Sequence, residues 1–192
     1  THAERALKLN PRLAWASTAV LQLQSAARDW EGAALTLQQQ AKSGLLPTEE
    51  SNRKQAVIYT AQALALEDSQ RASARDLALR AQRLDPSLVP AALVAARVYS
   101  AEGYPKKAVR VLQETWRRNP HPDLAEVMAH VKPGEGPEPR FERVRDLVNG
   151  HAGGLEGAYA LARAAGLAQR WDVARKALDP YLADQPQARV CA

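Results

Sequence analysis

The sequence predicts an all-α fold, an array of about five helical hairpins. Three observations predict it: a fixed spacing, small apolar residues at every third or fourth position, and no alternating strand pattern. Pro86 and Pro120 stand 34 residues apart, each follows Asp or Asn, and each precedes a new helical pattern. Aromatic residues make up only 5% of the chain, so we expect small side chains at the helix contacts and close helix packing.

The first three hairpins follow one another along the chain. After a helical start at "THAERALKLNP", the first full hairpin begins near Ala14, and Trp30 opens its second helix. The second begins after "KSGLLPTEESN", where Ser, Thr and Glu before an apolar run are typical of a helix start. The third is "YSAEGYPKKAVRVLQETWRRNP", in which Ala108 lies 34 residues after Ala74 of the second hairpin. We expect alanine at this position because the two helices of a hairpin cross most closely there.

The fourth hairpin departs from the pattern. "HPDLAEVMAHV" predicts a short first helix and "FERVRDLV" a second, but the intervening "KPGEGPEP" is too long for a tight turn. We expect a degenerate, loop-containing unit over residues 121–154, with 132–139 as the most mobile internal segment. The fifth hairpin has Ala158 in its first helix and Trp171 in its second. Prolines that end or follow second helices are Pro11, Pro47, Pro86, Pro120 and Pro186.

A period of 34 residues is that of tetratricopeptide repeats, which the chain resembles. The resemblance implies a tetratricopeptide-type α-solenoid, a right-handed superhelix in which each hairpin buries its apolar face on its neighbours. We expect a single repeat domain over residues 1–192, and a fragment of a longer protein because the sequence begins inside a helical pattern. No run of about 18 apolar residues and no signal-peptide pattern occurs, so the fragment itself is predicted to be soluble.

No group of residues in the sequence indicates catalysis or metal binding. The four histidines lack paired-ligand spacing, and the one cysteine, Cys191, has no nearby Cys or His partner. Nucleophile-elbow and glycine-rich phosphate-loop motifs are missing. The net charge is +5, but no aromatic residues alternate with the basic ones as a base-stacking surface requires. We therefore expect no enzyme, no metal, no cofactor and no nucleic-acid partner.

The surface offers two candidate sets. In a solenoid of this kind the first helix of each pair lines the concave face, and binding hot spots favour Arg and Tyr. The candidate partner-binding residues on that face are Trp15, Gln22, Tyr59, Arg97, Tyr159 and Arg163. The second set is basic and follows one second helix, either as a solvated face or as an attraction for anionic lipid or an acidic partner. It comprises Lys106, Lys107, Arg110, Arg117 and Arg118, with 106, 110 and 117 close to one face.

Beyond the repeat, several strings resemble the C-terminal region of the alphaproteobacterial HemY-like proteins, which are associated with haem biosynthesis. They are "LDPSLVPAALVAARVYSAEGYPKKAVRVLQETWRRNPHPDLAEV", "RFERVRDLVNGH" and "LARAAGLAQRWDVARKALDPYLADQPQARVCA". The resemblance implies a non-catalytic scaffold for late haem-biosynthesis enzymes on the cytoplasmic side of the bacterial inner membrane. Membrane contact would come only through N-terminal helices that this chain lacks.

Two alternative functions stay open. One is a co-chaperone-like adaptor for C-terminal peptides, although the Lys and Asn clamp of that type is not reproduced at the matching first-helix positions. The other is a haem- or porphyrin-binding carrier. Spectral titration with haem and porphyrin would separate a carrier from a scaffold.

Overall fold

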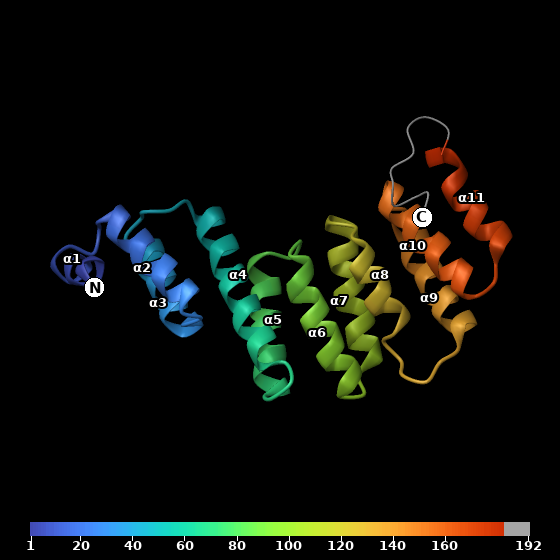
Figure 1. Cartoon of the computed structure of the whole chain (residues 1–192), viewed down its shortest axis with the longest axis horizontal. Coiled ribbons are helices and arrows are strands. Elements are labelled where there is room, and N and C mark those ends of the chain that lie inside the picture. The colour runs from blue at the N-terminus through green and yellow to red at the C-terminus, as the bar shows by residue number, and fades with distance from the viewer. Residues whose placement is uncertain (183–192) are drawn as a thin grey trace. The chain divides into compact units, whose positions relative to one another are not determined.

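The computed structural model describes residues 1–182, which form helices joined by short connections (Figure 1). Eleven α-helices and no strand occur in this range, which confirms the predicted fold class. The first six are α1 (His2–Leu9), α2 (Ala14–Ala26), α3 (Trp30–Lys42), α4 (Thr48–Leu66), α5 (Arg71–Leu84) and α6 (Val89–Ala101). The others are α7 (Pro105–Arg118), α8 (Pro122–Ala129), α9 (Pro137–Gly150), α10 (Gly154–Leu167) and α11 (Trp171–Leu182).

The helices from α2 to α11 form the five predicted hairpins, each of an even-numbered helix and the odd-numbered helix that follows it. The chain separates into two compact units, Thr1–Val94 and Ala95–Ala192, and the boundary lies inside the continuous helix α6. Within 1–182, no helix combines the length and the apolar character that a membrane span needs. Pro186 and Cys191, named in the sequence analysis, lie outside the described residues.

Three of the five hairpins are closed by the same turn, at residues 27–29, 102–104 and 168–170. The middle residue of each turn has a positive φ: 57° at Arg28, 79° at Gly103 and 58° at Gln169. An amide just past each helix end bonds back to a carbonyl five residues earlier, which is the Schellman arrangement. These bonds run from Asp29 N to Gln24 O, from Tyr104 N to Tyr99 O and from Arg170 N to Ala165 O, each 2.8 Å long.

The first unit is held by a core of small and aliphatic side chains where α3, α4 and α5 meet. Its buried members are Ala33, Ala34, Leu37, Ala56, Ile58, Tyr59, Ala81 and Ala91. Polar residues inside the unit are paired: Gln40 Nε2 donates to Ser17 Oγ at 2.6 Å between α3 and α2. The alanine expected at the helix crossing is fully buried both in the first hairpin, as Ala33, and in the second, as Ala74.

The acidic residue before the repeat proline Pro86 is Asp85, and its carboxylate has a structural role at this corner. Its carboxylate accepts hydrogen bonds from the backbone N–H of Ser87 at 3.0 Å and from the Ser87 hydroxyl at 2.6 Å. Arg53 of α4 donates to its other oxygen at 2.9 Å. Asp85 therefore closes the corner between two hairpins and ties that corner to α4.

The second unit has larger core residues, among them Trp116, Leu124, Met128 and Phe141. The Trp116 indole N–H donates to the His151 carbonyl at 2.7 Å, which joins α7 to the end of α9. Gly157 permits this region to close, because a Cβ at that position would lie 1.5 Å from the Ala152 carbonyl oxygen.

The irregular fourth hairpin is shorter in its loop than the sequence predicts. The connection occupies residues 130–136, because α9 begins at Pro137 and accommodates its prolines in the first turn, where no N–H donor is needed. The apolar pattern of "FERVRDLV" is confirmed, since Phe141, Val144, Leu147 and Val148 are all buried. The prediction that residues 137–139 belong to the linker was wrong, because they form the first turn of α9.

The 130–136 loop is tied to both of its helices. Arg143 of α9 donates to the Ala129 carbonyl at 3.0 Å and forms an ion pair with Glu135, and Lys132 lies 3.6 Å from the same carboxylate. The hydrogen bond from Arg143 lowers the pKa of Glu135, and the charges of Arg143 and Lys132 lower it further. These contacts hold the loop against α8 and α9, and the expectation that 132–139 is the most mobile internal segment stays a prediction.

Candidate interaction grooves

A groove lies between the first helices of the last two hairpins, α8 and α10, with α9 contributing to its lining. It encloses about 640 Å³, including the part open to solvent. Each helix contributes residues that recur at helical spacing. From α8 and its C-cap these are Pro122, Ala125, Glu126, Ala129 and His130; from α9, Pro137, Arg140, Phe141 and Val144; from α10, Tyr159, Ala160, Arg163, Ala164 and Leu167. We call this hollow the α8–α10 groove.

The α8–α10 groove is hollow because its two facing helices carry alanine at positions where larger side chains would fill the space. Ala125 and Ala129 on α8 face the same hollow as Ala160 and Ala164 on α10. A methyl side chain leaves room that a leucine would occupy, and the buried Phe141 ring forms part of the lining. The result is an apolar hollow with room for a side chain of another molecule.

A chain of polar contacts runs along the edge of this groove. Arg163 Nη2 lies 3.2 Å from Glu126 Oε2, and His130 Nδ1 lies 2.9 Å from the Glu126 carbonyl oxygen. Arg140 Nη1 lies 3.1 Å from His130 Nε2. A guanidinium can only donate, so Nε2 accepts, and Nδ1 carries the proton that is donated to the carbonyl. Arg163 is still 51% exposed and can contact a partner.

Arg140 makes less than its full set of hydrogen bonds. Its Nε is buried and has no hydrogen-bond partner, while Nη1 is engaged by His130. A second arginine, Arg170, stacks near the Phe141 ring at 5.9 Å and pairs with Glu138, which raises the pKa of the Arg170 guanidinium above its ordinary value. Arg140 therefore lines the α9 side of the groove, and Arg170 lies near the Phe141 ring without lining it.

A neighbouring hollow in the same unit lies between α6 and α8. Arg97, Ser100 and Ala101 line it from α6, and Glu126 and His130 contribute to it as well as to the α8–α10 groove. The Ser100 hydroxyl donates to the Val131 carbonyl at 2.7 Å and fixes the end of α6 against the loop after α8. Of the predicted site residues, Tyr159 and Arg163 line the α8–α10 groove and Arg97 lines the neighbouring hollow, and the two hollows share Glu126 and His130.

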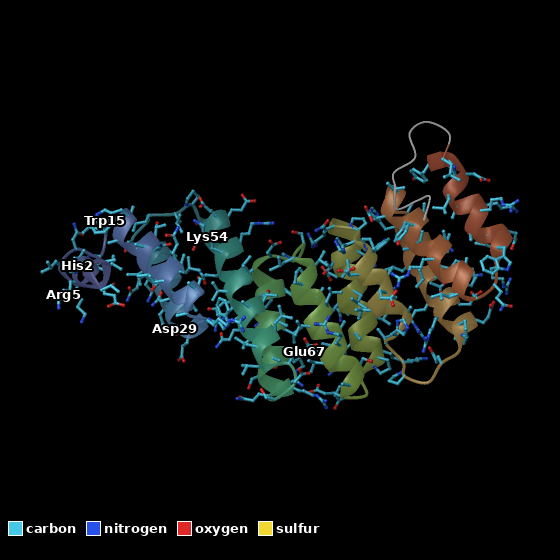
Figure 2. All side chains as sticks on the ribbon, in the orientation of Figure 1. His2, Arg5, Trp15, Asp29, Lys54 and Glu67 are labelled. Carbon is cyan, nitrogen blue, oxygen red and sulfur yellow. The ribbon has the colours of Figure 1, made fainter. Side chains whose placement is uncertain are left out.

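The other three predicted site residues lie in the first unit. Trp15 and Gln22 are exposed on α2, and Figure 2 labels Trp15 near the start of that helix. A hollow between α2, α3 and α4 is lined by residues that include Leu21, Arg53 and Val57, and neither Trp15 nor Gln22 is among them.

Tyr59 does not lie on an exposed face, and this expectation is corrected. It is only 3% exposed, its hydroxyl accepts a hydrogen bond from Gln38 at 3.1 Å, and Arg80 stacks over its ring at 4.4 Å. The side chain points into the contact between α3, α4 and α5, so it serves the core. One helical step of error in the register of the long helix α4 exchanges a buried for an exposed position.

Sequence reasoning missed Glu126, His130, Arg140 and Phe141 as groove residues. The available signal was the stripe of small and polar residues at helical spacing from Pro122 to His130. His121 caps the start of α8, because its Nδ1 accepts from the Asp123 N–H at 3.2 Å. Within 1–182, no three His, Cys, Asp or Glu side chains gather as they would around a metal ion.

No protein-family model and no curated protein matches the chain. Among solved structures it is similar to TTC0263, a thermophilic TPR protein in Thermus thermophilus, at 19% identity over 87% of both chains with a TM-score of 0.41. It is also similar to the MamA protein, at 13% identity over 89% of this chain and 94% of that chain, with a TM-score of 0.45. Both TM-scores lie below 0.5, so the repeat assignment rests on the hairpins and spacings of this chain. The described residues fold as helical hairpins, and a 34-residue spacing relates the second hairpin to the third.

Proposed function

We propose that this chain is a non-catalytic scaffold for protein partners and that the α8–α10 groove is its binding site. The observation that supports it best is an alanine-lined apolar hollow with an exposed arginine, Arg163, and a half-buried tyrosine, Tyr159, among its lining residues. Apolar space surrounded by Arg and Tyr is typical of protein-binding hot spots. Arg97 in the adjoining hollow adds a cation for an acidic partner surface.

The partner class we propose is the late enzymes of haem biosynthesis, at the cytoplasmic side of the bacterial inner membrane. This proposal rests on the HemY-like strings, of which "NPHPDLAEV" forms the start of α8 and so contributes directly to the groove. Ferrochelatase is the partner to test first.

The test fills the groove without changing its charges. Ala164→Phe puts a ring into the α8–α10 groove, and Ala72→Phe puts the same ring on the exposed face of α5 as a matched control. Binding of purified ferrochelatase to the immobilised chain is measured by interferometry, and both variants are checked for helicity. We expect Ala164→Phe to weaken binding at least tenfold and Ala72→Phe to leave it within twofold.

Two results would contradict the proposal. If the unmodified chain does not bind ferrochelatase, the haem-enzyme partner is rejected. If both variants bind as the unmodified chain does, the groove is not the binding site.

The second candidate is a porphyrin-binding carrier, favoured by one observation. His130, Arg140 and Arg163 line an apolar pocket, and haem proteins use an imidazole for the iron, which here would replace Arg140 at His130 Nε2. The arginines could pair with the two propionates. In a haem titration, a saturable shift of the Soret band that disappears in His130→Ala would support the carrier, and an unchanged spectrum would reject it.

A further inference from the structure

The exposed face of α7 carries two parallel rows of charged residues. Residues three, four or seven positions apart lie on the same side of a helix. One row, which we call the basic stripe, contains Lys106, Arg110 and Arg117; all three are exposed. The other row contains Lys107, Glu114 and Arg118.

The two rows differ in what holds their charges. Lys107 Nζ lies 4.4 Å from the centre of the Tyr104 ring, and Arg118 pairs with Glu114 at 3.4 Å. Over the described range 1–182, no residue of the basic stripe forms an ion pair, a side-chain hydrogen bond or a ring contact. The charges of the basic stripe are thus available to another molecule.

One of these charges, Lys106, stands where helix energetics disfavour it, whereas Arg117 lies in the last turn of α7, where the helix dipole favours a cation. The first turn of α7 has no acidic residue, and its N-cap Tyr104 forms no side-chain cap. Lys106 therefore faces the positive end of the helix dipole, and it also lies four residues from the like charge of Arg110. A local arrangement that opposes helix stability is expected where a residue serves a function.

We propose that the basic stripe of α7 docks an acidic segment of a partner protein. At 1.5 Å per residue the three cations lie along the helix axis at 0, about 6 and about 17 Å, a row that matches carboxylates at the same spacing on one partner helix. This surface shares no residue with the α8–α10 groove, so the proposal does not depend on the proposed function.

The narrowness of the stripe favours a protein segment over a membrane surface. Helix α8, which packs against α7, contributes Asp123 and Glu126 and no Lys or Arg. The largest apolar residues of α7, Leu112 and Trp116, are buried and unavailable for insertion into lipid. Polybasic membrane binding draws on clusters of four to eight cations near the surface. Helix α7 carries five exposed cations, but Glu114 lies among them, and the three cations of the basic stripe form a single line that fits an acidic helix better than a membrane surface.

The test compares neighbouring pairs on the same helix. Lys106→Gln/Arg117→Gln removes one Lys and one Arg from the basic stripe, and Lys107→Gln/Arg118→Gln removes one Lys and one Arg from the other row. The probe is a fluorescein-labelled, amidated helical peptide with Glu at positions 1, 5 and 12, titrated with the full chain at low salt and followed by anisotropy. We expect the first pair to weaken binding at least tenfold and the second pair at most twofold.

Three results would overturn the proposal. Equal losses in both pairs would show that only net charge matters. Equal binding of a peptide with its three Glu residues on different faces would remove the geometric match. Absence of peptide binding, together with stripe-dependent binding to vesicles of phosphatidylcholine with phosphatidylserine, would assign the surface to a membrane. Melting curves are expected to show no loss of stability in the first pair, which excludes unfolding as the cause.

Discussion

Arg28 and Gln169 adopt the left-handed backbone conformation that Gly103 adopts in the equivalent turn. A side chain in this conformation costs about 1–2 kcal/mol, and glycine avoids that cost. We expect Arg28→Gly and Gln169→Gly each to stabilise the fold by about 0.5–1 kcal/mol after the entropy cost of glycine. Gly103→Ala should destabilise it by about 1–2 kcal/mol. The measurement is urea unfolding followed by circular dichroism.

Gly136 provides the control for this set, because its φ is −72° and a Cβ there would meet open space. Gly136→Ala should therefore change the free energy of unfolding by less than any of the three turn substitutions. A gain in stability from Gly103→Ala would contradict the shared turn geometry.

At the scale of the element, Ala108 and Ala174 occupy the same repeat position in α7 and α11 but differ in burial. Ala108 has no exposed surface, whereas Ala174 is half-buried in a helix that has no fully buried residue among those described. Leucine at position 108 should overpack the helix crossing and cost about 1–3 kcal/mol. Ala174→Leu should cost under about 1 kcal/mol, because its side chain can turn toward solvent. Equal shifts in melting temperature would refute this difference.

The loop between α8 and α9 depends on the ionised form of Glu135. The folded pKa of this carboxyl is lowered by Arg143, so its contribution to stability is present above the unfolded value of about 4.3 and is lost as the pH falls through the folded value. We expect hydrogen-exchange protection in residues 130–136, corrected for the intrinsic rate, to decrease as the pH falls below about 4.3. Glu135→Gln should show the reduced protection already at neutral pH.

The exposed Glu114 provides the control for this experiment, since it lies on α7 and pairs only with Arg118 of the same helix among the described residues. Glu114→Gln should leave the exchange of 130–136 unchanged at every pH. Equal protection of the loop in the unmodified chain at pH 7 and pH 3, after correction for the intrinsic rate, would show that Glu135 does not anchor it.

At the scale of the whole molecule, the helix α6 is shared by the two compact units, with Val89–Val94 in one and Ala95–Ala101 in the other. Repeat proteins unfold together when the coupling between neighbours is strong, and separately when it is weak. Val94→Pro breaks the helix at the boundary, at a cost of about 3 kcal/mol or more. We expect it to split one calorimetric transition into two.

Val94→Ala is the matched control, because it removes buried volume at the same site but keeps the helix hydrogen bond. It should lower the melting temperature and keep a single transition. Two transitions in the unmodified chain would show that α6 does not couple the units.

The sequence by itself determined the helices, their pairing and the alanines at the crossings, because all three depend on local spacing. Apolar residues at a period of 3.6 and prolines that cannot continue a helix place Ala33, Ala74 and Ala108 without reference to distant residues, and a 34-residue spacing relates Ala74 to Ala108. Only the tertiary structure decided which side chains are buried and which lie together at the surface. Tyr59 is buried because α3 and α5 close on α4, and Glu126, His130 and Arg163 form one edge because α8 and α10 pack together. Such neighbours are brought together by packing over many residues, for which local spacing carries no signal.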